Sequence, residues 1–141
     1  MSEMMQVVAA AACCPPKPPL AERPLLAPAD ARRLEALFQI LANDTRIRLL
    51  HALVRAEELS PSDLASMLEM KPQAVSNQLQ RLTDKGILEW RRNGIQVYYR
   101  IVDPCVVSLL DHGLCVAVDA EARGQWKPGP PRGPSTEEVF G

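Results

Sequence analysis

The residues best suited to chemistry recur on one polar face between positions 72 and 84. Amide, hydroxyl and guanidinium side chains are spaced there as on a helix, namely Gln73, Ser76, Asn77, Gln80 and Arg81. Such groups match the donor and acceptor patterns that base edges present in the major groove of DNA. On the opposite side, Val75, Leu79 and Leu82 recur at the i, i+4 and i+7 positions. The spacing predicts an amphipathic helix whose outer face contacts bases or nearby phosphates.

Two β-rich runs after this helix predict a hairpin. They cover residues 88–92 and 96–101 and flank Asn93-Gly94, a pair that suits a tight turn whose two central residues both need positive φ. The hairpin carries Arg91, Arg92 and Arg100. A polar helix followed by a basic hairpin is typical of a DNA-binding unit, in which the helix enters the major groove and the hairpin lies as a wing on the backbone.

The charge distribution supports this interpretation. Residues 71–101 contain six basic and two acidic side chains, a net charge of +4, whereas the whole chain has a net charge of −1. Segregated positive charge is typical of phosphate binding. Lys71 precedes Pro72 at the expected helix start and is a poor N-cap, so we expect it to meet the DNA backbone together with Arg91 and Arg92. The alternative is a solvated helix beside an ordinary hairpin.

Thiols form the second chemically interesting group. Cys13 and Cys14 are adjacent in a proline-rich stretch, and Cys105 and Cys115 lie ten residues apart in an apolar segment. Thiolates prefer soft metal ions, so these four residues and the nearby Asp103 are candidate ligands. Each has a structural alternative: Cys105 and Cys115 as small hydrophobes at an interface, and Asp103 as an N-cap.

Helix geometry restricts how these thiols can combine. Cys105 and Cys115 would lie about 15 Å apart along one helix, so they cannot share an ion within one chain. Antiparallel packing of two such helices would bring Cys105 of one protomer near Cys115 of its partner. Alternatively, the segment with Cys13 and Cys14 would swing onto Cys105.

Composition places the chain among single-domain proteins. Its 141 residues are enough for one domain with a sizeable core. No run is long enough to span a bilayer, and a secretory signal is not expected because the start lacks a basic region and contains Glu3. We therefore expect a cytoplasmic protein with reduced thiols, in which cysteines indicate metal or redox chemistry more than structural disulfides.

The elements that position these residues follow from periodicity and proline placement. Six prolines in residues 1–28 predict a flexible arm that holds the cysteine pair, and residues 123–141 form a similar, disordered tail. Residues 29–122 form the domain, which is mainly α, with five helices and a β-hairpin wing. Ser60 and Asp103 are suited to cap helices that begin at Pro61 and Pro104. The predicted helices are 29–42, 44–56, 61–68, 72–84 and 104–122.

Residues 69–71 give the short connection of a helix-turn-helix between the third and fourth helices. In helix 44–56 we expect Ile47, Leu50 and Val54 to face inward. The first and last helices have more apolar surface than so small a domain can cover. We therefore expect a dimer through these two helices, and a dimer binds a two-fold symmetric operator.

Four motifs resemble those of the ArsR/SmtB family of bacterial winged helix-turn-helix repressors. They are LANDTRIRLL, ELSPSDLA, AVSNQLQRL and GIQVYYRI, within a resemblance that covers residues 34–120. The resemblance implies a homodimer on operator DNA that a thiophilic or divalent metal ion releases, of the Cd, Pb, Zn or As(III) class. Metal-sensing members often carry cysteines where this chain has Ser60 and Ser62. Asp103 and Cys105 match a carboxylate–histidine pair of the family, with thiolate in place of imidazole.

The main hypothesis is thus a DNA-binding repressor released by a thiophilic metal ion. One alternative is a thiol-redox-responsive or other non-metal repressor of the same type. A more distant alternative is a protein-interaction module that works through its proline-rich ends. An enzyme is not expected, because the two histidines are far apart and no nucleophile is paired with a base.

Overall fold

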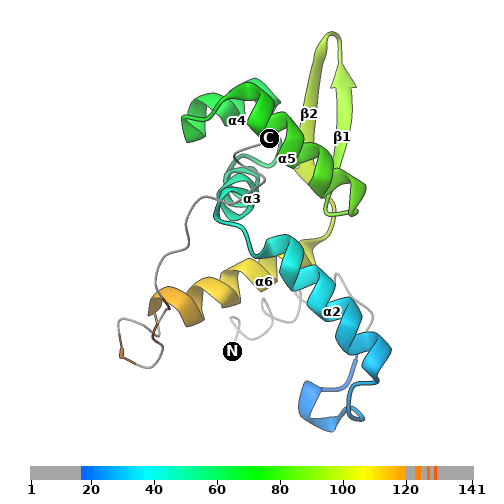
Figure 1. Ribbon diagram of the computed structural model, residues 1–141. Helices are drawn as coiled ribbons and strands as arrows, with labels where there is room; N and C mark the ends of the chain where they lie inside the picture. The colour runs from blue at the N-terminus through cyan, green and yellow to red at the C-terminus, as the bar shows by residue number, and fades with distance from the viewer. Residues whose placement is uncertain (1–16, 120–122, 125–126, 128, 130–141) are drawn as a thin grey trace, which may run out of the picture.

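The computed structural model describes residues 17–119, 123, 124, 127 and 129 of the chain. In Figure 1, α4, α5 and the hairpin occupy one end of the molecule, α2 and α6 occupy the other, and α3 lies between them. The mainly helical winged helix-turn-helix predicted from the sequence is confirmed. The elements are η2 (Leu20–Glu22), α2 (Pro28–Leu41), α3 (Asp44–Ala56), α4 (Pro61–Leu68), α5 (Pro72–Asp84), β1 (Leu88–Asn93), β2 (Gln96–Ile101), α6 (Pro104–Leu114) and the π-helical η3 (Cys115–Asp119).

Capping side chains determine where these helices begin. The Asn43 side chain accepts a hydrogen bond from the Arg46 backbone N–H at 3.1 Å and starts α3. Ser60 and Asp63 form a capping box at the start of α4. Each of these caps satisfies backbone N–H groups that have no partner within the helix. Since these signals are local, the predicted starts of α3 and α4 are correct. The helix α5 also begins as predicted, at Pro72, but without a side-chain cap.

The last predicted helix differs from the structure. The α-helix ends at Leu114, and residues Cys115–Asp119 continue as a π-helical turn. The rest of the predicted helix, 120–122, lies outside the described residues, as do residues 1–16 and most of the predicted tail. The division into arm, domain and tail therefore stays a prediction. Within the described residues, no helix has the length and apolar character needed to cross a membrane.

The core lies between α3, α4, α5 and the base of the hairpin. Among the described residues, seven side chains are fully buried, namely Leu49, Leu50, Leu53, Leu64, Val75, Leu79 and Leu82. The stripe expected on α5 is confirmed, but the expectation for α3 is wrong at two positions. Ile47 and Val54 are 43% and 38% exposed. Because α3 is apolar on more than one side, periodicity allowed two stripes, and packing against α4 and β2 selects the one that contains Leu49 and Leu53.

The hairpin turn is shifted by one residue from its predicted position. Asn93 pairs with Gln96, so the two-residue loop is Gly94-Ile95. Gly94 has a φ of +66°, and Asn93 has no positive φ. A two-residue loop with positive φ only at its first central position requires glycine there. Asn93 therefore ends β1, and Ile95 lies at the tip of the wing with 98% of its side chain exposed.

A buried polar link ties α5 to the rest of the domain. Arg46 is only 9% exposed, and its Nε donates to Oε1 of the buried Gln78 at 2.8 Å. Its Nη1 donates to the backbone carbonyl of Ile40, near the end of α2, at 3.1 Å. One guanidinium thus joins α2, α3 and α5. Sequence patterns did not reveal this link, because the two residues are 32 positions apart.

Replacing Gln78 by Leu should lower the free energy of unfolding by about 1–3 kcal/mol, because it leaves the buried guanidinium without one acceptor. The double variant Arg46→Met with Gln78→Leu removes donor and acceptor together and should recover most of that loss. Urea denaturation followed by circular dichroism measures both. The single variant Arg46→Met is measured in the same way. If its loss and that of Gln78→Leu simply add in the double variant, the hydrogen bond is not the cause.

Candidate nucleic-acid interface and thiol positions

A tight connection places α5 against α4. Glu69 ends α4 in the left-handed conformation, with φ 55° and ψ 47°. The backbone N–H of Met70 then donates to the carbonyl of Ala65 at 2.9 Å. This closes the last turn of α4 and lets α5 begin at Pro72. Residues 69–71 thus form the helix-turn-helix connection that the sequence predicted.

Burial of the inner stripe turns the polar face of α5 outward. Gln73, Gln80 and Arg81 are exposed, and Ser76 and Asn77 are half-buried. The side-chain amide of Gln73 donates to Oδ1 of Asn77 at 3.0 Å, and that of Gln80 donates to Oδ1 of Asp84 at 2.9 Å. Side chains four residues apart are neighbours on a helix, so the amides form an ordered row. The structure thus brings all five predicted residues together on one face.

Lys71 lies at the N-terminal end of this row. It is exposed and occupies the N-cap position of α5 without a side-chain capping hydrogen bond. The first N–H groups of α5 therefore lack the partner that serine or aspartate would supply there. This combination agrees with the expectation that Lys71 is a poor cap.

Strand pairing separates the wing arginines. Arg91 is opposite Tyr98 and Arg92 is opposite Val97, and successive side chains of a strand point to opposite faces. The guanidinium carbon of Arg91 lies 5.2 Å from the centre of the Tyr98 ring. On the same face, Arg100 forms an ion pair with Glu89. Arg92 is exposed on the other face, and no hydrogen bond or ion pair joins it to any residue that the structure describes.

Glu58, which the sequence analysis did not identify, is the partner of Arg91. The Arg91 Nε donates to Oε2 of Glu58 at 2.9 Å, and Nη2 donates to Oε1. This hydrogen bonding lowers the pKa of the Glu58 carboxyl below its ordinary value and raises the pKa of Arg91. Both groups are therefore charged at neutral pH. Glu58 lies 33 residues before Arg91, outside the window in which the net charge of +4 was counted.

The thiols of α6 are far apart within one chain. Cys105 is half-buried in the first turn of α6, and Cys115 is exposed where α6 becomes π-helical. Asp103 caps α6, and its Oδ1 accepts from the Cys105 N–H at 2.8 Å. Among the described residues no group of three or more His, Cys, Asp and Glu side chains is arranged to hold a metal ion. Cys13 and Cys14 lie outside the described residues, so their predicted role is untested.

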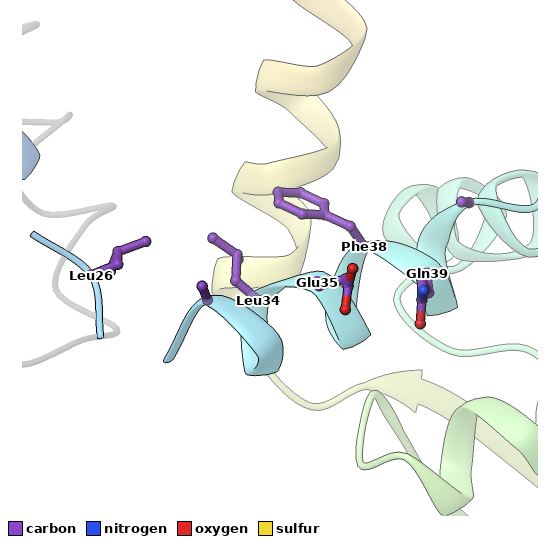
Figure 2. A pocket seen from close by; sticks show the side chains of 7 residues that line it. Leu26, Leu34, Glu35, Phe38 and Gln39 are labelled. Atoms are coloured by element: carbon purple, nitrogen blue, oxygen red, sulfur yellow. The ribbon is translucent and has the colours of Figure 1, made fainter. Parts of the chain in front are cut away.

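Apolar side chains of α2 and α6 are uncovered in the single chain. Leu34 and Phe38 on α2 are 41% and 48% exposed, and Leu114 at the end of α6 is 58% exposed. Figure 2 shows Leu34 and Phe38 projecting from the same side of α2. Beside them is an open hollow of about 430 Å³ with an almost entirely apolar lining that includes Leu26. Exposed apolar side chains that gather on one side of a helix in this way are typical of an interaction surface.

Comparisons with known proteins place this arrangement in a family. A family model described as MarR family matches residues 43–94, which run from α3 to the end of β1 and leave out α2, β2 and α6. A transcriptional repressor SmtB homolog from Synechocystis is 38% identical over 79 residues, which are 56% of this chain and 59% of that protein. The chain thus spans less than two thirds of the length of this relative.

Two further proteins match over more of their length. A probable mercury resistance operon repressor from Streptomyces lividans is 33% identical over 102 residues, which are 72% of this chain and 78% of that protein. The crystal structure of the antimony-specific transcriptional repressor AntR is 54% identical, with a TM-score of 0.67 over 77% of this chain and 98% of that one. Together with the winged helix-turn-helix and its two flanking helices, these matches show that the chain belongs to the ArsR/SmtB family of transcriptional repressors.

Proposed function

We propose that the protein is a dimeric transcriptional repressor that binds operator DNA through α5 and the wing and is released by a thiophilic metal or metalloid ion. The observation that carries the proposal is the outward row of amide and guanidinium groups on α5, held beside a wing that bears Arg92. Family membership supports a regulator of transcription rather than an enzyme.

In the proposed complex, α5 enters the major groove. Its polar row contacts bases: amides pair with adenine and the Arg81 guanidinium with guanine, as these groups do in other complexes. Lys71 and Arg92 meet phosphates. Arg91, the other wing arginine expected from the sequence to meet the backbone, is hydrogen-bonded to Glu58. Two copies of α5, related by a two-fold axis, bind two half-sites of one operator.

The dimer forms through α2 and α6. These two helices lie at the end of the molecule away from α5 and the wing (Figure 1). Leu34 and Phe38 on α2 and Leu114 at the end of α6 are exposed apolar side chains. A winged helix-turn-helix domain from Mycobacterium bovis, 26% identical to this chain, is described as homodimeric. The hydrophobic effect favours the burial of these side chains in a dimer.

The inducer is an ion that prefers sulfur. Two relatives are named for mercury resistance and for antimony, and both elements are thiophilic. The candidate ligands of this chain are mainly thiols, which soft ions prefer. We place the ion between Cys105 of one protomer and Cys115 of the partner subunit, with Asp103 and the arm residues Cys13 and Cys14 as further ligands. Binding favours a dimer whose two α5 helices no longer fit the half-sites, at a coupling energy of about 1–3 kcal/mol.

Replacing Asn77 and Arg81 together by Ala should weaken binding to operator DNA by roughly 100-fold, because each base contact contributes about 1–3 kcal/mol of discrimination. Fluorescence anisotropy with DNA from the upstream region of the protein's own gene measures the affinity. Arg55→Ala removes an exposed charge from α3 and serves as the control. Retained operator affinity in the double variant would contradict the role assigned to α5.

Replacing Lys71 by Ser should separate stability from binding. Serine caps α5, so the free energy of unfolding should rise by about 0.5–1 kcal/mol. The loss of one phosphate contact should weaken DNA binding and reduce the slope of log K against log salt concentration by about 0.9. Thermal melts and salt-dependent anisotropy test the two effects, and unchanged salt dependence would remove Lys71 from the interface.

The shared thiol site can be tested by complementation in reduced, anaerobic samples with Zn(II), Cd(II), Pb(II), As(III) or Sb(III). One ion should release the wild-type protein from DNA, and homodimers of Cys105→Ser or of Cys115→Ser should not respond. Mixed dimers that combine the two variants should regain release, because one Cys105–Cys115 pair across the interface is intact.

A mixed dimer that stays on DNA would contradict the shared site. If the double variant Cys13→Ser with Cys14→Ser is no longer released from DNA by the ion, the cysteines of the arm are ligands as well. If the protein is released from DNA in the absence of any ion, and dithiothreitol reverses that release, the thiol-redox alternative is favoured instead.

A further inference from the structure

A constrained backbone holds Glu58 beside the wing. The N–H of Glu58 donates to the carbonyl of Ala56 at 2.8 Å, around Glu57 with φ 68° and ψ −49°. This is a γ-turn with positive φ, a rare and strained conformation for a residue other than glycine. Immediately afterwards, Leu59 and Tyr99 exchange two backbone hydrogen bonds of 3.2 and 2.9 Å. Glu58 is thus fixed at the outer edge of β2.

From this position the carboxylate neutralises one face of the wing. Its two oxygens accept hydrogen bonds from Nε and Nη2 of Arg91, and the guanidinium lies over the Tyr98 ring. Glu89 binds Arg100 on the same face. Two arginines of the wing therefore have carboxylate partners within the chain. The opposite face carries Arg92, to which the described part of the chain offers no counter-ion.

We propose that Glu58 sets the DNA affinity of the wing by withholding Arg91 from the DNA phosphates, so that Arg92 makes the backbone contact. This inference rests on the proposed DNA-binding function and refines it. A phosphate offers a guanidinium the same paired oxygen acceptors as a carboxylate, so the edge of Arg91 that Glu58 occupies is closed to DNA. The negative charge of Glu58 also repels a phosphate that approaches this face.

Replacing Glu58 by Gln keeps the shape of the side chain and removes its charge, and it should open Arg91 to a phosphate. One added contact should tighten operator binding roughly three- to ten-fold near 0.1 M salt and steepen the slope of log K against log salt concentration by about 0.9. Glu57→Gln is the matched control. It removes the same charge from the neighbouring residue, whose side chain does not form the ion pair with Arg91. It should change affinity and slope much less.

Two arginine variants complete the test. In the wild-type background, Arg91→Gln should change affinity less than two-fold, whereas Arg92→Gln should weaken binding and reduce the slope by about 0.9. In the Glu58→Gln background, Arg91→Gln should abolish the gain. Because the Glu58–Arg91 pair is exposed, it contributes little to folding, and circular dichroism melts check that all variants are folded.

The outcomes separate this inference from the function on which it rests. Wild-type protein that binds no operator would contradict both. Operator binding that Glu58→Gln tightens no more than Glu57→Gln, or that it weakens, would overturn the role of Glu58 alone. The same holds if Arg91→Gln costs as much affinity and slope as Arg92→Gln.

Discussion

The burial of one side of α5 is the constraint on which the rest of the structure depends. Val75, Leu79 and Leu82 are completely buried, so the helix can lie against α4 and β1 in only one rotation. That rotation determines which side chains form the outer row. Gln78 further restricts the orientation of α5. It accepts a hydrogen bond from Arg46, and a hydrogen bond requires a specific geometry, which hydrophobic packing does not.

Arg46 also connects the two ends of the molecule. The helix α5 and the wing are at one end and α2 and α6 are at the other (Figure 1), yet one guanidinium donates hydrogen bonds to Ile40 in α2 and to Gln78 in α5. Arg46 therefore connects α2, which we propose for dimerisation, with the inner side of α5, which we propose for DNA binding.

Helix starts, which depend on neighbouring residues, were predictable from the sequence, although the hairpin loop was placed one residue too early. Contacts between distant residues were not predictable. The starts of α3 and α4 follow from Asn43 and Ser60, which act within one helical turn. The stripe on α3 was misassigned because its selection depends on what packs against it. Glu58 was missed since its partner is 33 residues away. The thiol site remains a prediction, because it requires a second protomer and arm residues that the structure does not describe.

The π-helical turn at Cys115–Asp119 has a consequence for comparing this chain with its relatives. A π-turn closes its hydrogen bonds over five residues rather than four, so it accommodates one extra residue per turn. The side chains of residues 116–119 are therefore rotated relative to the directions they would take in a regular α-helix. Side-chain spacings that assume a regular α-helix do not carry over from a relative across this turn.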